Sequence, residues 1–224
     1  MLFNIFGTFF VKIIADLLMN IMADTTRTQI VKLAAQQFKQ YGIRSVSIDD
    51  LCRMLNMSKK TFYLYFRQKE DLIVAVLEMI DNCISAYMTE KLSGKSALEC
   101  VRIFVDSMNE LKDIQNQPPF IYDLRKYYPD IKNKHDAQIN DIVREHISNH
   151  LKKGIAEGIY RDDLDIEACA SYVTLVNQSW VYEAFNPQYI TKERLLKFIT
   201  NSLIRSIMTE KGLEEVRSRM KGEK

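Results

Sequence analysis

The chain has 224 residues, of which 47% are hydrophobic and 27% are charged, and its formal net charge is only +2. These fractions are ordinary for a folded globular protein, so they exclude a disordered chain. Few glycines, few prolines and many strong helix formers predict an all-helical fold. The four cysteines lie in apolar helical patterns without a C-x-x-C pair, so we expect reduced thiols and a cytoplasmic protein.

The first 22 residues are strongly apolar, yet they lack the pattern of a membrane span. Lys12 and Asp16 interrupt them, and their longest clean run, residues 5–11, is far shorter than the roughly 20 residues that a span requires. They also lack the basic start of a signal peptide. Three interpretations stay open: a helix on a membrane surface, an extra helix packed on the body, or an upstream stretch that precedes a true start at Met22. We favour the third.

Residues 23–72 combine positive charge with helix signals. They carry nine Lys or Arg residues against five Asp or Glu, a net charge of +4, which leaves −2 for the rest of the chain. Thr26 and Gln29 form a capping box, and apolar residues follow at helical spacing until Gly42. This pattern predicts a first helix over about 27–41. A basic module on a mildly acidic body fits a head that binds DNA.

Two further helices are predicted directly after the first. Ser47 and Asp50 give the start of a short helix that ends near Leu55. Asn56 then stands where the chain must turn sharply, and Asn tolerates the left-handed conformation well. Ser58 caps a third helix. Its side chains divide into an inner pair, Phe62 and Phe66, and an outer set, Lys59, Lys60, Tyr63 and Arg67. Such a short helix, turn and basic capped helix is the arrangement that enters a DNA major groove.

The stretch 26–72, above all S-I-D-D-L-C-R-M-L-N-M-S-K-K-T-F-Y-L-Y-F-R-Q-K-E-D-L, resembles the DNA-binding domain of the TetR family. In that family a Ser-x-x-Asp-Ile-Ala start leads to a Val-Ser-x-Gly-Thr-Leu-Tyr-x-His-Phe recognition helix and then to a Lys-x-x-Leu. The resemblance covers about a fifth of the chain. It departs from the family pattern at Lys60 for Gly, at Asn56 for the turn Gly, at Val46 for Thr and at Tyr65 for His.

The resemblance implies which side chains contact DNA. Lys59 and Lys60 would approach bases or phosphates, and Ser58 belongs to the same surface. Lys60 would alter the sequence preference, since a cation can bond to guanine O6 and N7 where Gly cannot. The residues expected at phosphates are Ser47, Thr61, Tyr63, Tyr65 and Lys69.

The rest of the chain is predicted to be a helical body. One long helix runs from about 72 to 88, and breaks at Pro and Gly separate further helices at about 96–112, 119–127, 130–157, 165–185 and 192–210. The resemblance implies nine helices in all. The expected domains are an apolar extension at 1–22, a helix-turn-helix domain at 23–72, an effector-binding and dimerisation body at 73–210 and a charged tail at 211–224.

In the TetR family the last two helices form a four-helix bundle across a two-fold axis. The resemblance therefore implies a homodimer through 165–185 and 192–210, and double-stranded DNA with an inverted-repeat operator as its partner. It also implies a cavity for a small apolar effector in the body, although the same side chains can form an ordinary core. The expected lining is Phe104, Met108, Phe120, Tyr122, Tyr127 and Trp180.

The sequence has no pattern typical of an enzyme. It lacks a nucleophile elbow, a Gly-rich phosphate loop and an H-E-x-x-H motif, so we expect neither catalysis nor a cofactor. His135, His146 and His150 share one helical stripe. Only His146 and His150 are near enough along the helix to share an ion, and no third ligand is evident, so we expect no metal.

The sequence thus predicts a sequence-specific DNA-binding transcriptional regulator, a repressor that an effector releases. The alternative is a membrane-associated adaptor that uses residues 1–22 as an anchor, with the basic face of the head on anionic lipid. Binding would depend on salt in both cases. Only a preference for one DNA sequence separates the two hypotheses.

Overall fold

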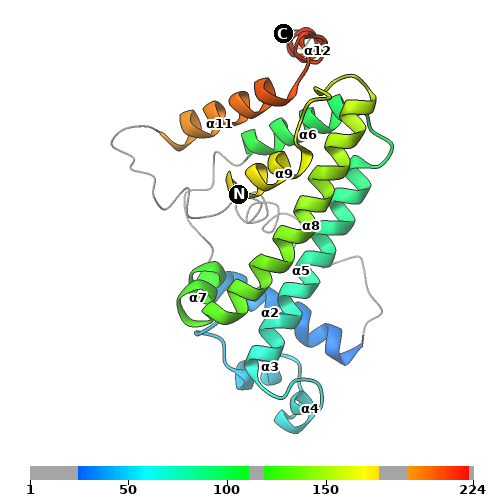
Figure 1. Cartoon of the computed structure of the whole chain (residues 1–224). Coiled ribbons are helices and arrows are strands. Elements are labelled where there is room, and N and C mark those ends of the chain that lie inside the picture. The colour runs from blue at the N-terminus through cyan, green and yellow to red at the C-terminus, as the bar shows by residue number, and fades with distance from the viewer. Residues whose placement is uncertain (1–24, 111–118, 177–190, 222–224) are drawn as a thin grey trace. The chain divides into compact units, whose positions relative to one another are not determined.

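The computed structural model describes residues 25–110, 119–176 and 191–221 (Figure 1). The secondary-structure elements of these ranges are all α-helices, which confirms the predicted fold class. Contacts divide the chain into two compact units. The described residues of the first, called the head unit, are 25–90 and 119–139, and those of the second, called the body unit, are 91–110, 140–176 and 191–221.

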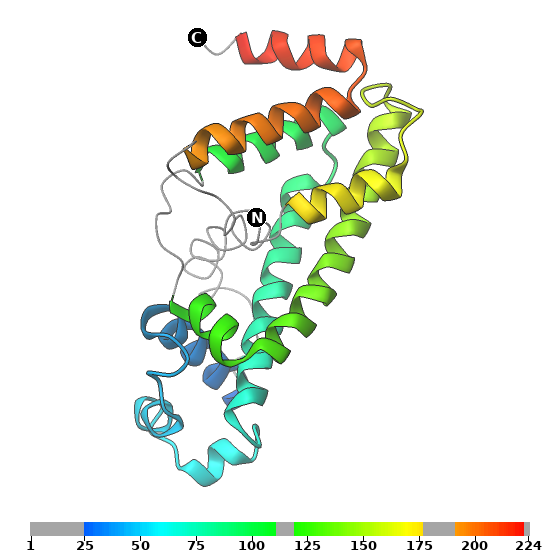
Figure 2. The same cartoon turned by 60° about the vertical axis from the view of Figure 1, so that its left-hand side comes forward.

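The head unit contains six helices or parts of helices. Helices α2 and α7 pack against each other, as do α2 and α3, and α3 and α4 (Figure 2). The bounds are α2 Thr26–Tyr41, α3 Ile48–Met54, α4 Lys59–Tyr63, α5 Lys69–Leu92 as far as Glu90, α7 Pro119–Tyr127 and α8 Pro129–Ala156 as far as Ile139. The compact unit is therefore larger than residues 23–72 alone.

Helix α2 begins one residue earlier than the sequence predicts. Thr25, not Thr26, is its N-cap: the Thr25 backbone is extended (φ −81°, ψ 154°), and its side-chain oxygen accepts a hydrogen bond of 3.3 Å from the Thr28 amide. Two adjacent threonines offer the same chemistry, and the one with the extended backbone becomes the cap. The helix ends at Gly42, which has a φ of +83°, as the sequence predicts.

The core of the head unit forms where α2 meets its neighbours. The ring of Phe38 in α2 lies parallel to the ring of Phe120 in α7, with 6.2 Å between centroids. Burying an aromatic ring contributes about 1.5–3 kcal/mol, so this pair stabilises the α2–α7 contact. The other fully buried large side chains of the unit are Ile30, Ile43, Leu51, Phe62, Leu72, Ile73, Val76 and Leu124.

A buried polar contact also ties α5 to α8 within the head unit. The His135 Nε2 atom lies 2.9 Å from both carboxylate oxygens of Asp81. His135 is buried, so this partner satisfies a polar group that water does not reach. The contact fixes the side-by-side position of the two helices at this level.

The body unit is built around one apolar cluster. Its helices are α6 Ala97–Glu110, the part of α8 from residue 140, α9 Ile166–Val176, α11 Lys192–Ile207 and α12 Glu210–Lys221. The buried residues of the cluster are Ala97, Leu98, Val101, Leu151, Ile159, Tyr160, Ile207 and Met208. A bridge between Tyr160 and Met208 holds the α8–α9 and α11–α12 connections together.

Helix α12 is a difference from the predicted set of nine helices. The described ranges alone contain ten, because part of the expected charged tail is helical. Thr209 starts it: its side-chain oxygen accepts a hydrogen bond of 3.0 Å from the Gly212 amide. Leu213 and Val216 then pack on the apolar cluster. The many charged residues of this segment hide the helical spacing of these two apolar residues, which are only three positions apart.

The half-buried His150 and the buried Tyr160 form a second polar pair, in the body unit. The His150 Nε2 atom is hydrogen-bonded to the Tyr160 hydroxyl, and the two rings meet edge to face at 5.4 Å between centroids. Gly154 leaves room for the tyrosine ring, since a Cβ there would lie 2.0 Å from its Cδ2 atom. Burial lowers the pKa of His150 and raises the pKa of Tyr160.

The lowered pKa of His150 predicts a dependence of stability on pH. An unfolded histidine titrates near pH 6.5, so below that value the unfolded chain binds a proton that the folded chain resists. The free energy of unfolding should therefore fall as the pH drops from 7.5 to 5.5. Urea unfolding across this range should show a shallower fall for His150→Gln. The matched variant is His146→Gln, because His146 is exposed, and it should keep the wild-type slope. Identical slopes for all three proteins would contradict the prediction.

Candidate nucleic-acid interface

The candidate interface starts with α3, whose first turn is fixed by Ser47. The Ser47 hydroxyl oxygen accepts a hydrogen bond of 3.0 Å from the Asp50 amide, and the Ser47 amide donates to the Asp50 carboxylate at 3.1 Å. This is the capping box that the sequence predicts. The hydrogen bonds from Ser47 are the largest cause of the lowered pKa of Asp50. The cap fixes where Ser47 presents its hydroxyl.

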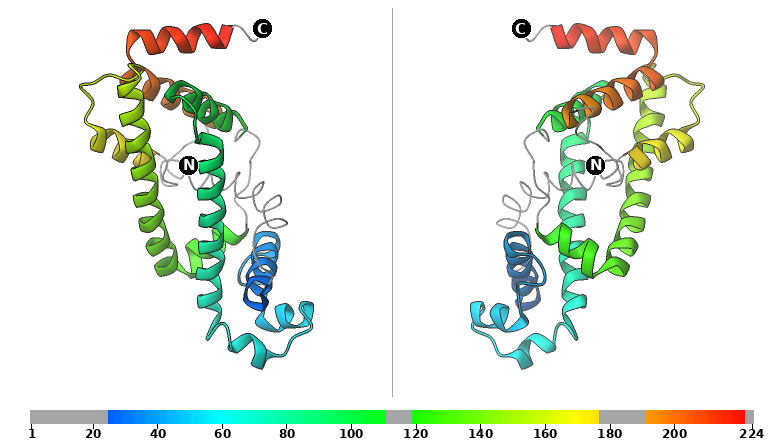
Figure 3. Two further views of the ribbon diagram at one scale, coloured as in Figure 1. Left: turned by 90° about the vertical axis from the view of Figure 1, so that its right-hand side faces the viewer. Right: turned by 90° about the vertical axis from the view of Figure 1, so that its left-hand side faces the viewer.

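A tight turn joins α3 to α4. Asn56 has a φ of +50°, the left-handed conformation that the sequence predicts for it. The Met57 amide then donates to the Cys52 carbonyl at 2.9 Å, which closes the turn. Ser58 caps α4, accepting a hydrogen bond of 3.0 Å from the Thr61 amide. Two capped helices thus follow each other with the spacing of a helix-turn-helix (Figure 3).

The segment from Ser58 to Phe66 has a buried side and an exposed side, as predicted, but its helix α4 ends at Tyr63, before Tyr65 and Phe66. Phe62 and Phe66 are buried, with 5.6 Å between their ring centroids. On the outer side Tyr63 is 49% exposed and Tyr65 is 42% exposed, so both phenol groups can reach a ligand. Of the other residues expected at DNA, Ser47, Ser58, Lys59 and Lys60 are exposed and Thr61 is half-buried.

The two lysines that begin α4 differ in their surroundings. The Lys59 ammonium forms an ion pair of 2.7 Å with the Asp49 carboxylate of α3, and this hydrogen bond raises the pKa of Lys59. Among the described residues, Lys60 takes part in no ion pair or hydrogen bond. The exposed Lys60 ammonium is therefore open to a ligand, and its contact with a base or a phosphate stays a prediction. The sequence alone did not reveal the role of Asp49 as the partner of Lys59.

Lys69 points into the head unit. Its ammonium donates to the carbonyl oxygen of Ile43 at 2.6 Å and to that of Val46, and burial lowers its pKa. These bonds fasten the start of α5 to the α2–α3 connection. The resemblance implies a phosphate contact for Lys69. In this structure two donors of its ammonium bond to these carbonyls, and a phosphate contact of Lys69 stays a prediction.

Of the residues expected to line an effector cavity, only the three on α7 have side chains that the structure describes. Phe120 is buried against α2, whereas Tyr122 and Tyr127 are 44% and 37% exposed on the surface of α7. Phe104 and Met108 belong to α6, but their side chains lie outside the described part of the structure, and so does Trp180. A cavity lined by these side chains stays a prediction.

The histidines and cysteines offer no common site in the described ranges. His135 and His150 each have their own partner, Asp81 and Tyr160. No group of three or more His, Cys, Asp or Glu side chains in these ranges could hold a metal ion. All four cysteines are free, and burial raises the pKa of each thiol.

Comparison with known proteins decides which family this head represents. Residues 30–76 match the family model described as bacterial regulatory proteins, tetR family. The transposon Tn10 TetC protein of Escherichia coli is 30% identical over 139 residues, which are 57% of this chain and 69% of that protein. The chain belongs to the TetR family. As a TetR-family protein it is a DNA-binding transcriptional regulator, as the sequence predicts.

Other relatives and solved structures agree with this TetR-family membership. The HTH-type transcriptional repressor KstR2 of Rhodococcus jostii is 22% identical over 158 residues, which are 69% of this chain and 76% of that protein. A TetR-family regulator from Cytophaga hutchinsonii has the same fold, with a TM-score of 0.61, 18% identity, and coverage of 85% of this chain and 100% of that chain. The reduced form of NemR of E. coli also has this fold, with a TM-score of 0.59 and 17% identity. That match covers 83% of this chain and 98% of the NemR chain.

The Ser47 capping box makes a testable contribution to the stability of the TetR-family head. Ser47→Ala removes the acceptor of the Asp50 amide, so we expect the melting temperature to fall by about 2–4 °C. Ser45→Ala is the control, since Ser45 is exposed and lies outside the helix. Its melting temperature should equal that of the wild type in the same calorimetric scan. If the melting temperature of Ser47→Ala equals that of the control, the cap does not contribute to the stability of the protein.

Proposed function

We propose that this TetR-family protein is a repressor that binds an inverted-repeat operator as a homodimer and is released by a small apolar effector. The observation that carries the proposal is the exposed N-terminal turn of α4, where Lys60 stands with Tyr63 and Tyr65 around it. Several relatives, among them KstR2 of R. jostii and of Mycolicibacterium smegmatis, are named repressors. We place its action in the cytoplasm and propose no enzymatic reaction for it.

Operator reading follows from how the donors of α4 are arranged. Lys60 would donate to guanine O6 and N7 in the major groove, while Lys59, held by Asp49, would stay beside the phosphates. The hydroxyl groups of Ser47, Thr61, Tyr63 and Tyr65 are expected to bind phosphates on either side of the groove. In this proposal one cation recognises the base and the hydroxyl groups position the protein on the phosphates. Sequence-specific binding to DNA needs both kinds of contact.

The dimer in this proposal uses the helices that follow α8. On α11 the Phe198 side chain is 68% exposed, and on α9 Tyr172 is 47% exposed. A second copy of the chain would cover these rings, since exposed apolar rings commonly mark an interface. The predicted range 165–185 extends beyond α9, and its residues from 177 lie outside the described ranges.

Effector release needs a path from the predicted body, residues 73–210, to the predicted DNA-binding domain, residues 23–72. Helix α7 is suited to this role because it contacts α2 through the Phe38 and Phe120 rings. The buried Asp123 carboxylate of α7 also accepts a hydrogen bond of 2.9 Å from the Arg44 amide, in the α2–α3 connection. A shift of α7 on effector binding would therefore move the connection that leads into α3.

The alternative, a membrane-associated adaptor, has less support than a DNA-binding regulator. It depends on residues 1–22, which lie outside the described ranges. Among the helices that the structure describes, none combines the length and the apolar character that crossing a membrane requires.

The proposal predicts a preference for one DNA sequence that depends on Lys60. Fluorescence anisotropy would compare duplexes from the DNA around the gene of this protein with a scrambled duplex of equal composition. Lys60→Ala should reduce the preference by about 5- to 150-fold, the value of one good base contact. Tyr63→Phe should weaken binding to both duplexes alike, because it removes a phosphate contact.

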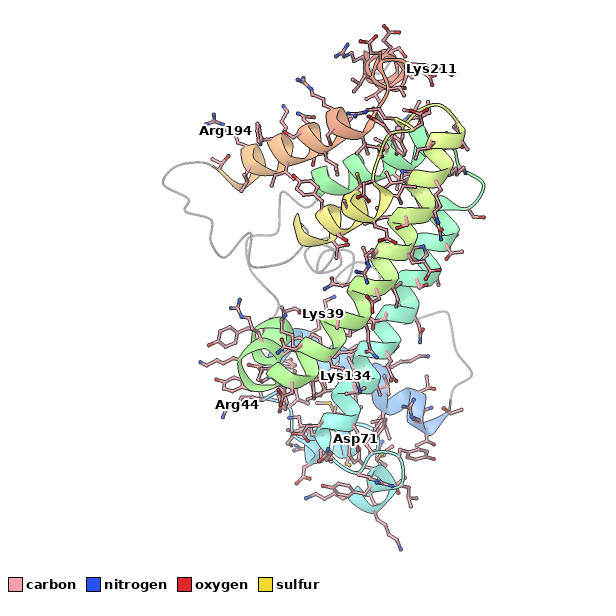
Figure 4. The ribbon with its side chains drawn as sticks, in the orientation of Figure 1. Lys39, Arg44, Asp71, Lys134, Arg194 and Lys211 are labelled. Atoms are coloured by element: carbon pink, nitrogen blue, oxygen red, sulfur yellow. The ribbon has the colours of Figure 1, made fainter. Side chains whose placement is uncertain are left out.

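The matched control for these variants is Lys134→Gln, since Lys134 is an exposed cation on α8 in the same unit (Figure 4). It should bind like the wild type. Equal affinity of the wild type for every duplex would refute operator recognition and favour the membrane-associated adaptor.

A further inference from the structure

A second group of cations gathers on α7 and the α2–α3 connection, apart from the outer face of α4. The Arg44 guanidinium lies 4.3 Å from the centroid of the Tyr127 ring. The Lys126 ammonium lies 5.3 Å from the same centroid and donates a hydrogen bond of 2.8 Å to the Tyr122 hydroxyl. Arg44, Tyr122, Lys126 and Tyr127 are all exposed. We call these four residues the α7 patch.

The α7 patch is held in place by the core beneath it. Asp123, one turn before Tyr127 on α7, is buried, and its carboxylate accepts a hydrogen bond from the backbone amide of Arg44. This bond fixes the backbone of the α2–α3 connection at the residue from which the Arg44 side chain extends. Stacking on Tyr127 then fixes the direction of its guanidinium. The cations are therefore organised before any ligand arrives, which lowers the entropic cost of binding one.

The requirements of the fold explain only part of this arrangement. Lys126 lies in the last turn of α7, where a cation favours the helix dipole. Arg44 comes from another element and has no such reason to be there. Among the described residues neither Arg44 nor Lys126 forms an ion pair with a carboxylate. Two like charges beside one ring repel each other, and an anion between them would remove that repulsion.

The phenol group of Tyr127 lies within the influence of both cations. Hydrogen bonds from Arg44, and then from Lys126, lower the pKa of Tyr127. Both cationic groups lie beside the same ring, at 4.3 Å and 5.3 Å from its centroid, so their donors gather on one part of the surface. Convergent donors from arginine, lysine and tyrosine are typical of contacts to nucleic-acid phosphates.

We propose that the α7 patch binds a backbone phosphate of the operator outside the bases that α4 reads. The position of Arg44 in the chain favours DNA as the occupant, because Arg44 lies three residues before Ser47, which caps α3 on the DNA-binding face. Three residues span at most about 11 Å, so the two contacts fall on nearby phosphates of one duplex. The inference rests on the proposed operator binding and extends its footprint.

The test is the salt dependence of DNA binding by the full-length protein. One phosphate contact adds about 0.9 to the slope of log affinity against log salt, or about 1.8 for a dimer. Arg44→Gln combined with Lys126→Gln should lower the slope by this amount on a long duplex. Between 50 and 200 mM salt the wild type should therefore lose roughly 10-fold more affinity than the double variant.

Trimming the DNA locates the contact. On a duplex cut back to the bases that α4 reads, the wild type and the double variant should have the same slope. Arg44→Lys keeps the charge and should keep the wild-type slope on long DNA, and Lys134→Gln should keep it as well. Melting temperatures of all variants show that the comparison is between folded proteins.

The proposal is overturned if the double variant keeps the wild-type slope on long duplexes, which would leave the patch for an acidic protein partner. It is also overturned if the slope falls equally on long and trimmed DNA. A phosphate contact does not depend on base sequence, so scrambled duplexes serve equally well for this comparison. Failure of operator preference and failure of the α7 patch are therefore separate results.

Discussion

The recognition helix is too short to be stable by itself. Helix α4 has five residues, Lys59–Tyr63, and an isolated helix needs roughly 12–15 residues to be even marginally stable in water. Its shape is therefore imposed from outside, by the Ser58 cap at its start and by the burial of Phe62 and Phe66. Everything that places these rings, from the Asn56 turn to the core of α2, also places the outer face of α4. The operator reading that we propose therefore depends on a surface that the core holds in place.

The cations of the head unit illustrate how one charge type serves different purposes. Lys69 is half-buried and bonds to carbonyls, so it joins α5 to the α2–α3 connection. Lys59 is paired with Asp49 across the α3–α4 turn. Lys60 extends from α4 without such a partner in the described ranges, and Arg44 stacks on Tyr127. In our proposals only the last two contact DNA as part of a base or phosphate site that the protein leaves open, although the sequence alone does not distinguish the four cations.

Local patterns explain why the head could be predicted from the sequence. The Ser47 and Ser58 caps, the left-handed Asn56 and the inward Phe62 depend on residues within four positions of one another, and all were predicted correctly. The neighbour that makes Lys69 point inward comes from 23–26 residues away in the chain, so no local pattern reveals it. The same reason applies to Tyr127, whose partner Arg44 lies in another element. It also applies to α12, whose apolar residues pack on a cluster formed by distant parts of the chain.

Hydroxyl-radical footprinting of the purified protein on the DNA around its gene tests most directly whether α4 reads an operator as part of a symmetric dimer. We expect two protected stretches of related, inverted sequence, with centres about 34–36 Å apart along the duplex or a multiple of this spacing. Protection that is uniform along the DNA, or limited to one stretch without an inverted counterpart, would contradict operator reading by a two-fold dimer.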